Sequence, residues 1–246
     1  MTNFRLTLEY DGTDFDGWQI QAGGRRTVQG SLQEGIAQVT GRLVQVEGSG
    51  RTDAGVHAWG QVASVQLETR LDASTLQRAL NGVLPRDISV TEAVAAPADF
   101  RARGDARSKL YCYRFWNGAT PSPLRARFSS WVPRPLDLEA MRAAARALSG
   151  RHDFASFQAA GSSVAHTVRT LSRLELHGEV RGEIDLLAEG NGFLRHMVRN
   201  IAGTLVEVGL LRRAADSMPA LLAARDRRRA GPTAPAAGLA LVRVHY

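Results

Sequence analysis

The sequence predicts an α+β fold, because strand-like and helix-like segments follow one another in the same order in both halves of the 246-residue chain. Alternating apolar and polar residues indicate the strands, and apolar residues three or four positions apart indicate the helices. Each half has the order β-α-β-β-α-β, which is typical of ferredoxin-like and RRM-like units. We therefore expect two such halves, each with an antiparallel sheet.

Four strands and two helices are predicted in the first half. Residues 4–10 alternate between apolar and polar side chains and indicate the first strand, which a loop over 11–26 follows. Thr27 and Asp72 can each cap a helix, and the two helices should end at Gly41 and before Pro85. The remaining strands are expected at 43–47, 61–67 and 88–93.

The second half repeats this order. Tyr111, Tyr113 and Phe115 should share one face of its first strand, and Asp137 can cap its first helix. The strands are expected near 108–116, 169–177, 183–188 and 239–246, and further helices near 193–208 and 217–225. The polar, charged stretch 100–107 indicates a boundary, which gives predicted domains 1–103 and 104–246.

Composition narrows the class of protein. The formal net charge is +7, and nearly all of the positive charge is arginine, because Lys109 is the only lysine. A basic globular chain suits a polyanionic partner such as nucleic acid. No apolar run approaches the ~20 residues of a membrane span, and the N-terminus does not read as a signal peptide. Cys112 is the only cysteine, so we expect a cytoplasmic protein without an internal disulfide.

The most informative motif is residues 50–57, which read Gly-Arg-Thr-Asp-Ala-Gly-Val-His. Apolar, β-type runs flank it, so a glycine-rich turn between two strands should hold the carboxylate of Asp53. Glycine allows positive φ and close backbone approach, and a bulky ligand can then lie against the turn. An Asp-x-Gly sequence alone would indicate only a polar hairpin turn.

Other interpretations of the polar residues fail on spacing. Val56 and His57 stand where a phosphate-binding loop requires Lys-Ser/Thr, and the third glycine of a dinucleotide fingerprint is missing. A calcium loop that starts at Asp11 would need an acid at its twelfth position, which is Ala22. The histidines are scattered without metal-ligand spacing. We therefore expect His57 to pack or to form hydrogen bonds, and the acids of 11–16 to form turns.

The motif at 50–57 and the string Tyr-Asp-Gly-Thr-Asp-Phe-Asp-Gly-Trp-Gln at 10–19 resemble the tRNA pseudouridine synthase A family. Further strings that resemble the family lie at 100–103, 107–114, 152–157, 190–200 and 226–239. The resemblance implies an isomerase that converts uridines 38, 39 and 40 of the tRNA anticodon stem-loop to pseudouridine. It also implies a homodimer with a central basic cleft, and no metal or cofactor.

The resemblance assigns roles residue by residue. It makes Asp53 the catalytic nucleophile and Arg199, from the Asn-Gly-Phe-Leu-Arg-His-Met-Val-Arg-Asn string, its basic partner. Tyr111 is expected to stack on the target base and can serve in proton transfer. Arg51, next to the nucleophile, can help to extrude the base or hold the loop. An arginine near Asp53 would keep that carboxylate ionised beside an apolar base.

Two other functions stay open at this stage. The first is a catalytically silent RNA-binding module, for which Asp53 would be dispensable. The second is an aspartate-nucleophile hydrolase of a small ester or phosphoester, which would need further clustered acids to hold Mg²⁺. Both alternatives predict no chemistry at C5 of uridine.

Overall fold

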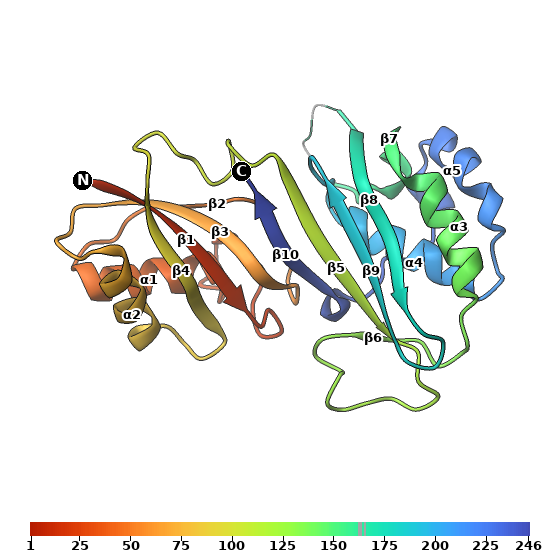
Figure 1. Cartoon of the computed structure of the whole chain (residues 1–246), viewed down its shortest axis with the longest axis horizontal. Helices are drawn as coiled ribbons and strands as arrows, with labels where there is room; N and C mark the ends of the chain where they lie inside the picture. Colours follow the sequence, from red (N-terminus) through yellow and green to blue (C-terminus); the bar gives the residue numbers. More distant parts are fainter. Residues whose placement is uncertain (162–163, 165) are drawn as a thin grey trace. The chain divides into compact units, whose positions relative to one another are not determined.

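The computed structural model describes residues 1–161, 164 and 166–246, and the chain divides into two units (Figure 1). Unit 1 contains Met1–Arg107 and Leu241–Tyr246, and unit 2 contains Ser108–Ala240. The domain boundaries expected from the sequence, 1–103 and 104–246, stay a prediction. The predicted α+β class with antiparallel sheets is confirmed.

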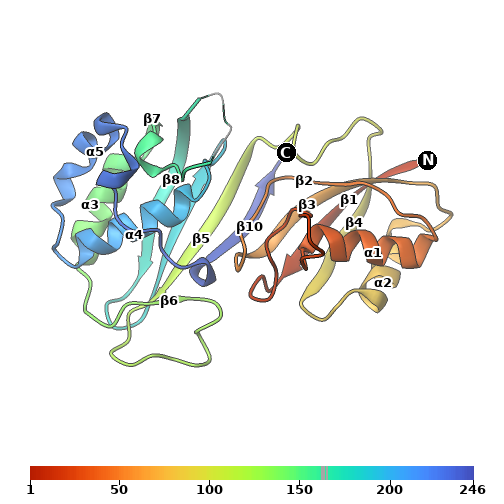
Figure 2. The same cartoon turned by 180° about the vertical axis from the view of Figure 1, so that it is seen from behind.

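Unit 1 has the element order β-α-β-β-α-β that the sequence predicts. Strand β1 (Thr2–Tyr10) lies between β3 (His57–Leu67) and β4 (Ile88–Ala96) and is antiparallel to both. The short strand β2 (Val46–Gly48) pairs with the outer edge of β3. Helices α1 (Val28–Thr40) and α2 (Ala73–Val83) cover one face of this sheet (Figure 2).

The predicted helix caps of unit 1 are confirmed. The hydroxyl of Thr27 accepts a hydrogen bond from the Gly30 amide at 3.2 Å, and Asp72 accepts one from the Thr75 amide at 2.7 Å. Helix α1 ends at Gly41, whose φ of 73° is left-handed and favours glycine. These contacts satisfy amide groups that have no partner inside the helix, so local sequence sets both helix starts.

The strands of unit 2 are β5 (Ser108–Trp116), β6 (Ser130–Trp131), β7 (Gly150–Asp153), β8 (Val168–Gly178) and β9 (Glu183–Gly190). Its helices are α3 (Leu138–Leu148), α4 (Met197–Gly209) and α5 (Met218–Ala224). Four of the strands form an antiparallel sheet in the order β5-β9-β8-β7, and the helices lie in front of this sheet in Figure 2. Helix α3 is capped by Asp137, as predicted, through the Ala140 amide at 2.9 Å.

Four short 3₁₀ helices and the last strand complete the elements. The 3₁₀ helices are Ala155–Phe157, Ala215–Ser217, Arg227–Arg229 and Ala236–Gly238. Strand β10 (Leu239–His245) begins in unit 2 and continues into unit 1, where the Arg107 amide donates to the His245 carbonyl at 2.8 Å.

Several boundaries differ from the prediction. Helix α4 begins at Met197 and not near 193, because His196 adopts a left-handed φ of 59° just before it. Strand β3 begins at His57, four residues before its predicted start. The short strands β6 and β7 were not predicted, since two and four residues carry too little periodicity to be detected.

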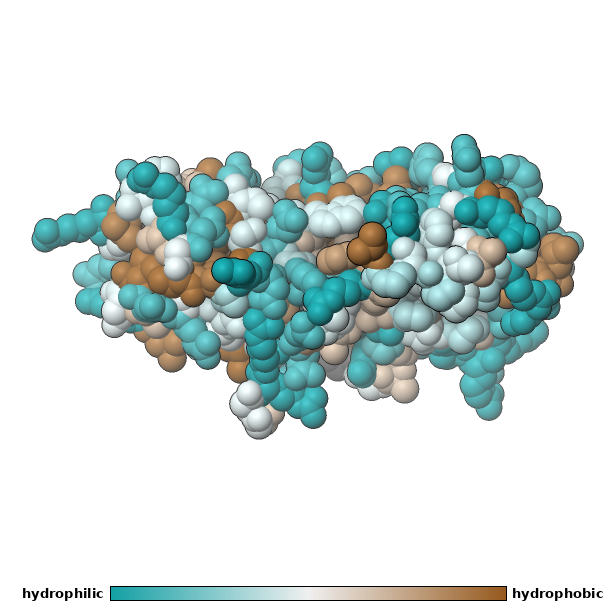
Figure 3. Space-filling model, turned by 90° about the horizontal axis from the view of Figure 1, so that it is seen from below, coloured by the Kyte–Doolittle hydropathy of each residue, from teal (hydrophilic) through white to brown (hydrophobic). Residues whose placement is uncertain are grey.

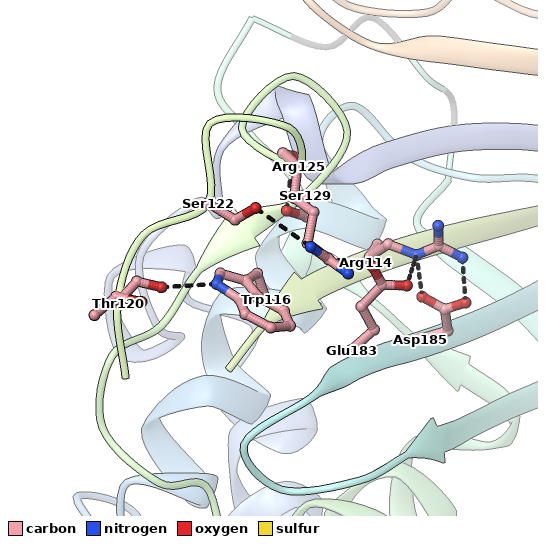
Figure 4. Close-up of polar contacts among 8 residues, drawn as sticks. All are labelled: Arg114, Trp116, Thr120, Ser122, Arg125, Ser129, Glu183 and Asp185. Carbon is pink, nitrogen blue, oxygen red and sulfur yellow. Dashed lines mark hydrogen bonds and ion pairs between the residues drawn. The ribbon is translucent and has the colours of Figure 1, made fainter. Parts of the chain in front are cut away.

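The two faces of β5 differ in character. Tyr113 and Phe115 are fully buried, as expected for side chains that share the core face with Tyr111. On the opposite face, Arg114 forms a two-pronged ion pair with Asp185 of β9, with both distances at 2.7 Å (Figure 4). Beside it, Arg125 stacks on Trp116 at 4.5 Å and ties the loop between β5 and β6 back to the sheet.

None of the helices in the described part of the chain is long and apolar enough to cross a membrane. Hydrophilic side chains cover much of the face seen in Figure 3, and apolar side chains form smaller groups between them.

Cys112 should be chemically inert in the folded protein. It is 2% exposed, and burial raises the pKa of its thiol to about 12, so almost no thiolate forms near neutral pH. We expect little alkylation by iodoacetamide at pH 8, and complete alkylation in urea, measured by intact mass. Rapid alkylation of the folded protein would contradict this and would mean that β5 opens locally.

Candidate active site

The Asp53 motif forms a tight turn between β2 and β3. The Val56 amide donates to the Asp53 carbonyl at 3.1 Å, and Gly55 has a φ of 76° within this turn. Asp53 is half-buried and Arg51 is exposed. The predicted glycine-rich turn is therefore confirmed, and it holds a carboxylate at the boundary between core and solvent.

A second loop, residues 11–18, docks on this turn through backbone atoms. The Trp18 amide donates to the Thr52 carbonyl at 3.0 Å, and the Gly55 amide donates to the Phe15 carbonyl at 3.2 Å. Gly17 makes this approach possible. Its φ is +90°, and a Cβ there would lie 2.7 Å from the Thr52 carbonyl oxygen. The two most characteristic strings of the sequence thus form one structure.

Buried side chains fix both ends of the Asp53 turn. On one side, Tyr10 Oη and Thr52 Oγ1 are hydrogen-bonded at 2.8 Å, and burial raises the pKa of Tyr10 to about 12. On the other side, Gln61 is fully buried, donates to the Gly50 carbonyl at 2.9 Å and accepts from Ser49 Oγ at 2.7 Å. The turn is therefore held by groups that stay neutral over the physiological pH range.

His57 and Asp11 have the structural roles that the sequence predicts, and a turn-forming role of Asp14 and Asp16 stays a prediction. The buried imidazole of His57 accepts a hydrogen bond at Nδ1 from the Gly12 amide at 3.0 Å. Asp11 Oδ1 accepts from the amide and the hydroxyl of Thr13, at 3.0 and 2.6 Å, which is an Asx turn. Trp18 is 2% exposed and packs against Gly48, so it belongs to the core.

In unit 2, Tyr111 lies on β5 opposite Ala188 of β9. Its ring meets that of Phe193 edge to face, with centroids 4.9 Å apart and an interplanar angle of 78°. Phe193 belongs to the segment that leads into α4, so this contact joins two of the family-like strings. Tyr113 is fully buried and its hydroxyl donates to the Pro235 carbonyl at 2.8 Å, so it is a core aromatic.

Arg199 lies in the first turn of α4. Its Nε donates to the Ala234 carbonyl at 2.8 Å, and the Ala234 amide donates back to the Arg199 carbonyl at 3.1 Å. Residues 230–235 therefore contact both α4, through Arg199, and β5, through Tyr113. This 230–235 segment links Arg199 to the strand that carries Tyr111.

Unit 1 brings two of the four predicted site residues together, because Arg51 and Asp53 share one turn. In unit 2, the 230–235 segment is hydrogen-bonded to Arg199 and to Tyr113, which lies two residues after Tyr111 on β5. Sequence reasoning missed Gly17 and Gln61, which support the Asp53 turn, and Arg227, which donates to the Gly231 carbonyl of the 230–235 segment at 2.9 Å. Gly17 and Arg227 lie inside the strings that were singled out, but nothing in their spacing indicates which distant atoms they contact.

Among the described residues, no three or more His, Cys, Asp or Glu side chains lie close enough together to hold a metal ion. The expectation that no cofactor is needed rests on the resemblance and stays a prediction.

The family comparison decides the class of this protein. The model of the tRNA pseudouridine synthase family matches residues 7–103 and 144–246, which include Asp53 and Arg199. The chain belongs to the tRNA pseudouridine synthase family. It is therefore an isomerase of the pseudouridine synthase class that modifies tRNA.

Curated tRNA pseudouridine synthases are similar over the whole chain. A tRNA pseudouridine synthase A of Myxococcus xanthus is 47% identical over 100% of this chain and 92% of its own length. Those of Roseiflexus sp. (strain RS-1) and Geotalea uraniireducens (strain Rf4) are 48% and 44% identical over 100% of this chain, and over 91% and 100% of their own lengths. A solved Cbf5-Nop10-Gar1 complex chain overlaps 96% of this chain and 57% of its own at 14% identity, and its TM-score of 0.35 is too low to support an inference.

The docking of the two loops should be essential to this pseudouridine synthase. Gly17→Ala places a Cβ against the Thr52 carbonyl and strains a φ of +90°, so we expect it to displace the Asp53 turn and lower kcat on tRNA by about 100-fold. Gly23→Ala is the matched control, because Gly23 also has a φ of +90° but has open space around it. Equal losses in the two variants would show that backbone strain, and not the loop contact, is responsible.

Proposed function

We propose that this chain converts uridines 38, 39 and 40 of the tRNA anticodon stem-loop to pseudouridine, with Asp53 as the nucleophile. The observation that carries the proposal is the docking of the 11–18 loop on the Asp53 turn. It presents a half-buried carboxylate on an anchored, glycine-containing turn. Such a turn combines a fixed reactive group with room for a bulky nucleoside.

The proposed reaction breaks the bond between C1′ of ribose and N1 of uracil and forms a bond between C1′ and C5. The hydrogen at C5 leaves as a proton and the freed N1 takes up a proton, so the product is an isomer of the substrate and no oxidant is required. An ionised carboxylate can serve as a nucleophile in this reaction, by addition to C6 or by attack at C1′. Asp53 has this role in the proposal, and Arg199 supplies the positive charge that favours its ionised form.

Tyr111 is proposed to receive the target base. A base in a helical stem must leave the stack before its glycosidic bond can be reached, which costs a few kcal/mol. Stacking on an aromatic side chain returns ~1–3 kcal/mol. The edge-to-face contact with Phe193 supports this role, because it holds the Tyr111 ring in one orientation. Arg51, exposed on the same turn as Asp53, is proposed to help extrude the base or to hold the loop.

The partner in this proposal is tRNA, bound by a homodimer in the cytoplasm. The net charge of +7 favours association with a polyanion. A tRNA is long relative to one 246-residue chain, so two copies can contact both its anticodon arm and a more distant part.

The chemistry is tested by tritium release from tRNA that is labelled at uridine C5. We expect release by the native protein and a loss of at least about 10⁴-fold in Asp53→Asn, with tRNA binding retained. Asp16→Asn is the matched control, since it removes a carboxylate from the neighbouring loop and should release tritium normally. The positions are tested with three transcripts that each keep one of uridines 38, 39 and 40.

Each alternative has its own outcome in this assay. Tight tRNA binding without release by the native protein would contradict the synthase proposal in favour of a binding module. Neither binding nor release would reopen the hydrolase interpretation. Release that persists in Asp53→Asn would leave the isomerase in place and reject its nucleophile.

Replacement of Tyr111 separates its two proposed contributions. Tyr111→Ala removes the stacking surface, so we expect kcat/KM to fall by about 5- to 150-fold, which corresponds to ~1–3 kcal/mol. Tyr111→Phe keeps the ring and removes only the hydroxyl, so any further loss in kcat measures a part in proton transfer. Single-turnover kinetics on one transcript give both numbers. Full activity of Tyr111→Ala would reject the stacking role.

A further inference from the structure

We propose that Arg227 is a positioning residue for the tRNA reaction, because it fixes the 230–235 segment to which Arg199 and Tyr113 are hydrogen-bonded. The inference rests on the proposed catalytic role of Arg199. Arg227 lies outside the predicted site and is the first of three consecutive arginines, 227–229.

Arg227 points into the protein and donates to four oxygens. Its Nη1 reaches the carbonyls of Gly231 at 2.9 Å and Ala230 at 3.4 Å. Its Nη2 reaches Asn200 Oδ1 at 2.9 Å and Thr233 Oγ1 at 3.0 Å. The planar, forked guanidinium presents donors to both groups of acceptors at once. It therefore ties the 230–235 segment to helix α4.

The neighbouring arginines behave differently. Asp226 caps the 3₁₀ helix through the Arg228 amide at 3.0 Å and pairs with the Arg228 side chain at 2.8 Å. Arg228 and Arg229 are exposed, whereas Arg227 is half-buried. The cap fixes the rotation of this short helix, so one arginine of the run is directed inward and two are directed outward.

Asn200 is the second member of the network. It is fully buried, and its amide nitrogen donates to the Phe157 carbonyl at 2.7 Å. Its Oδ1 accepts from Arg227 and, at 2.6 Å, from Thr233 Oγ1. Asn200 directly follows Arg199 in the first turn of α4, so the network acts on the part of the helix that carries the proposed catalytic cation.

Close packing leaves the segment no freedom to shift toward the helix. A Cβ on Gly203 would overlap the Pro232 carbonyl, and one on Gly231 would lie 2.7 Å from the Cα of Thr204. The Thr204 hydroxyl accepts from the Gly231 amide at 2.9 Å and donates to the Asn200 carbonyl at 2.7 Å. The segment and α4 thus form one packed body.

The network ends at Arg199, the proposed catalytic cation, and at Tyr113, a core residue of β5. The Ala234 carbonyl accepts from Arg199 Nε at 2.8 Å, and the Pro235 carbonyl accepts from the Tyr113 hydroxyl at 2.8 Å. Tyr113 lies on β5, two residues after Tyr111. A shift of about 1 Å in a catalytic group can lower a rate by about 100-fold. Loss of Arg227 should therefore impair the chemical step without removing any group that touches tRNA.

The test is a double-mutant cycle between Arg227 and Arg199. Arg227→Met keeps much of the side-chain volume and removes every donor. We expect it to lower single-turnover tritium release by about 10- to 100-fold, with KM for tRNA changed less than about twofold. Arg228→Met is the matched control from the same run and should be nearly as active as the native protein. In an Arg199→Ala background, Arg227→Met should cause less than about a twofold further loss.

Thr233→Val is a second test of the network if Arg227→Met folds poorly, because it removes the hydroxyl that is hydrogen-bonded to Arg227 and Asn200. It should lower release in the native background and not in the Arg199→Ala background. Near-ultraviolet circular dichroism and thermal unfolding verify that each variant is folded. An arginine with a purely structural role would cause the same fold-loss in both backgrounds.

The outcomes separate this inference from the proposed function. If Arg199→Ala is impaired and the losses are additive, the positioning role is wrong and the role of Arg199 stands. If Arg199→Ala releases tritium at the native rate, the proposed role of Arg199 fails, and the positioning inference fails with it. A rise in KM for Arg227→Met with unchanged kcat would also overturn the inference, because it would make Arg227 a tRNA contact.

Discussion

The need of irregular segments to satisfy their backbone hydrogen-bonding groups is the constraint on which the candidate site residues of both units depend. In unit 1, the 11–18 loop and the Asp53 turn satisfy one another's amides and carbonyls, although neither belongs to a sheet or a helix. Buried backbone polar groups require partners, so these two loops can be ordered only together. The orientation of Asp53 is therefore a property of the pair of loops.

In unit 2, side chains satisfy the backbone of an irregular segment. The 230–235 segment also lacks regular pairing along most of its length. The side chains of Arg227 and Thr204 are hydrogen-bonded to its backbone, and Asn200 is hydrogen-bonded to the side chains of Arg227 and Thr233. The segment in turn supplies carbonyl acceptors to Arg199 and Tyr113. An arginine whose Nε is hydrogen-bonded to a carbonyl keeps its guanidinium in a defined direction, which is the form of preorganisation that enzymes use.

The sequence predicted those features that depend on neighbouring residues. The caps Thr27, Asp72 and Asp137 accept hydrogen bonds within their own first turns, and periodicity located the long strands. It could not predict the late start of α4, because a left-handed His196 carries no sequence signature. It could not distinguish Arg227 from Arg228 either, since identical side chains differ only in what the tertiary structure places beside them. The motif strings identified the Asp53 turn. They could not predict that Gly17 lies against Thr52, or that Gln61 is hydrogen-bonded to Ser49 and Gly50, because these partners are distant in the sequence.

The contact between Gly203 and the Pro232 carbonyl has a consequence for how this protein can change. Both partners are backbone atoms, so the space at residue 203 is limited by the path of the chain and not by the size of any side chain. Damage in a side-chain core can be repaired by a smaller neighbour, because volume can be exchanged between residues. No such exchange is available here. A genetic search for second-site suppressors of a substitution at residue 203 should therefore return true revertants, or changes that re-route residues 230–235 as a whole.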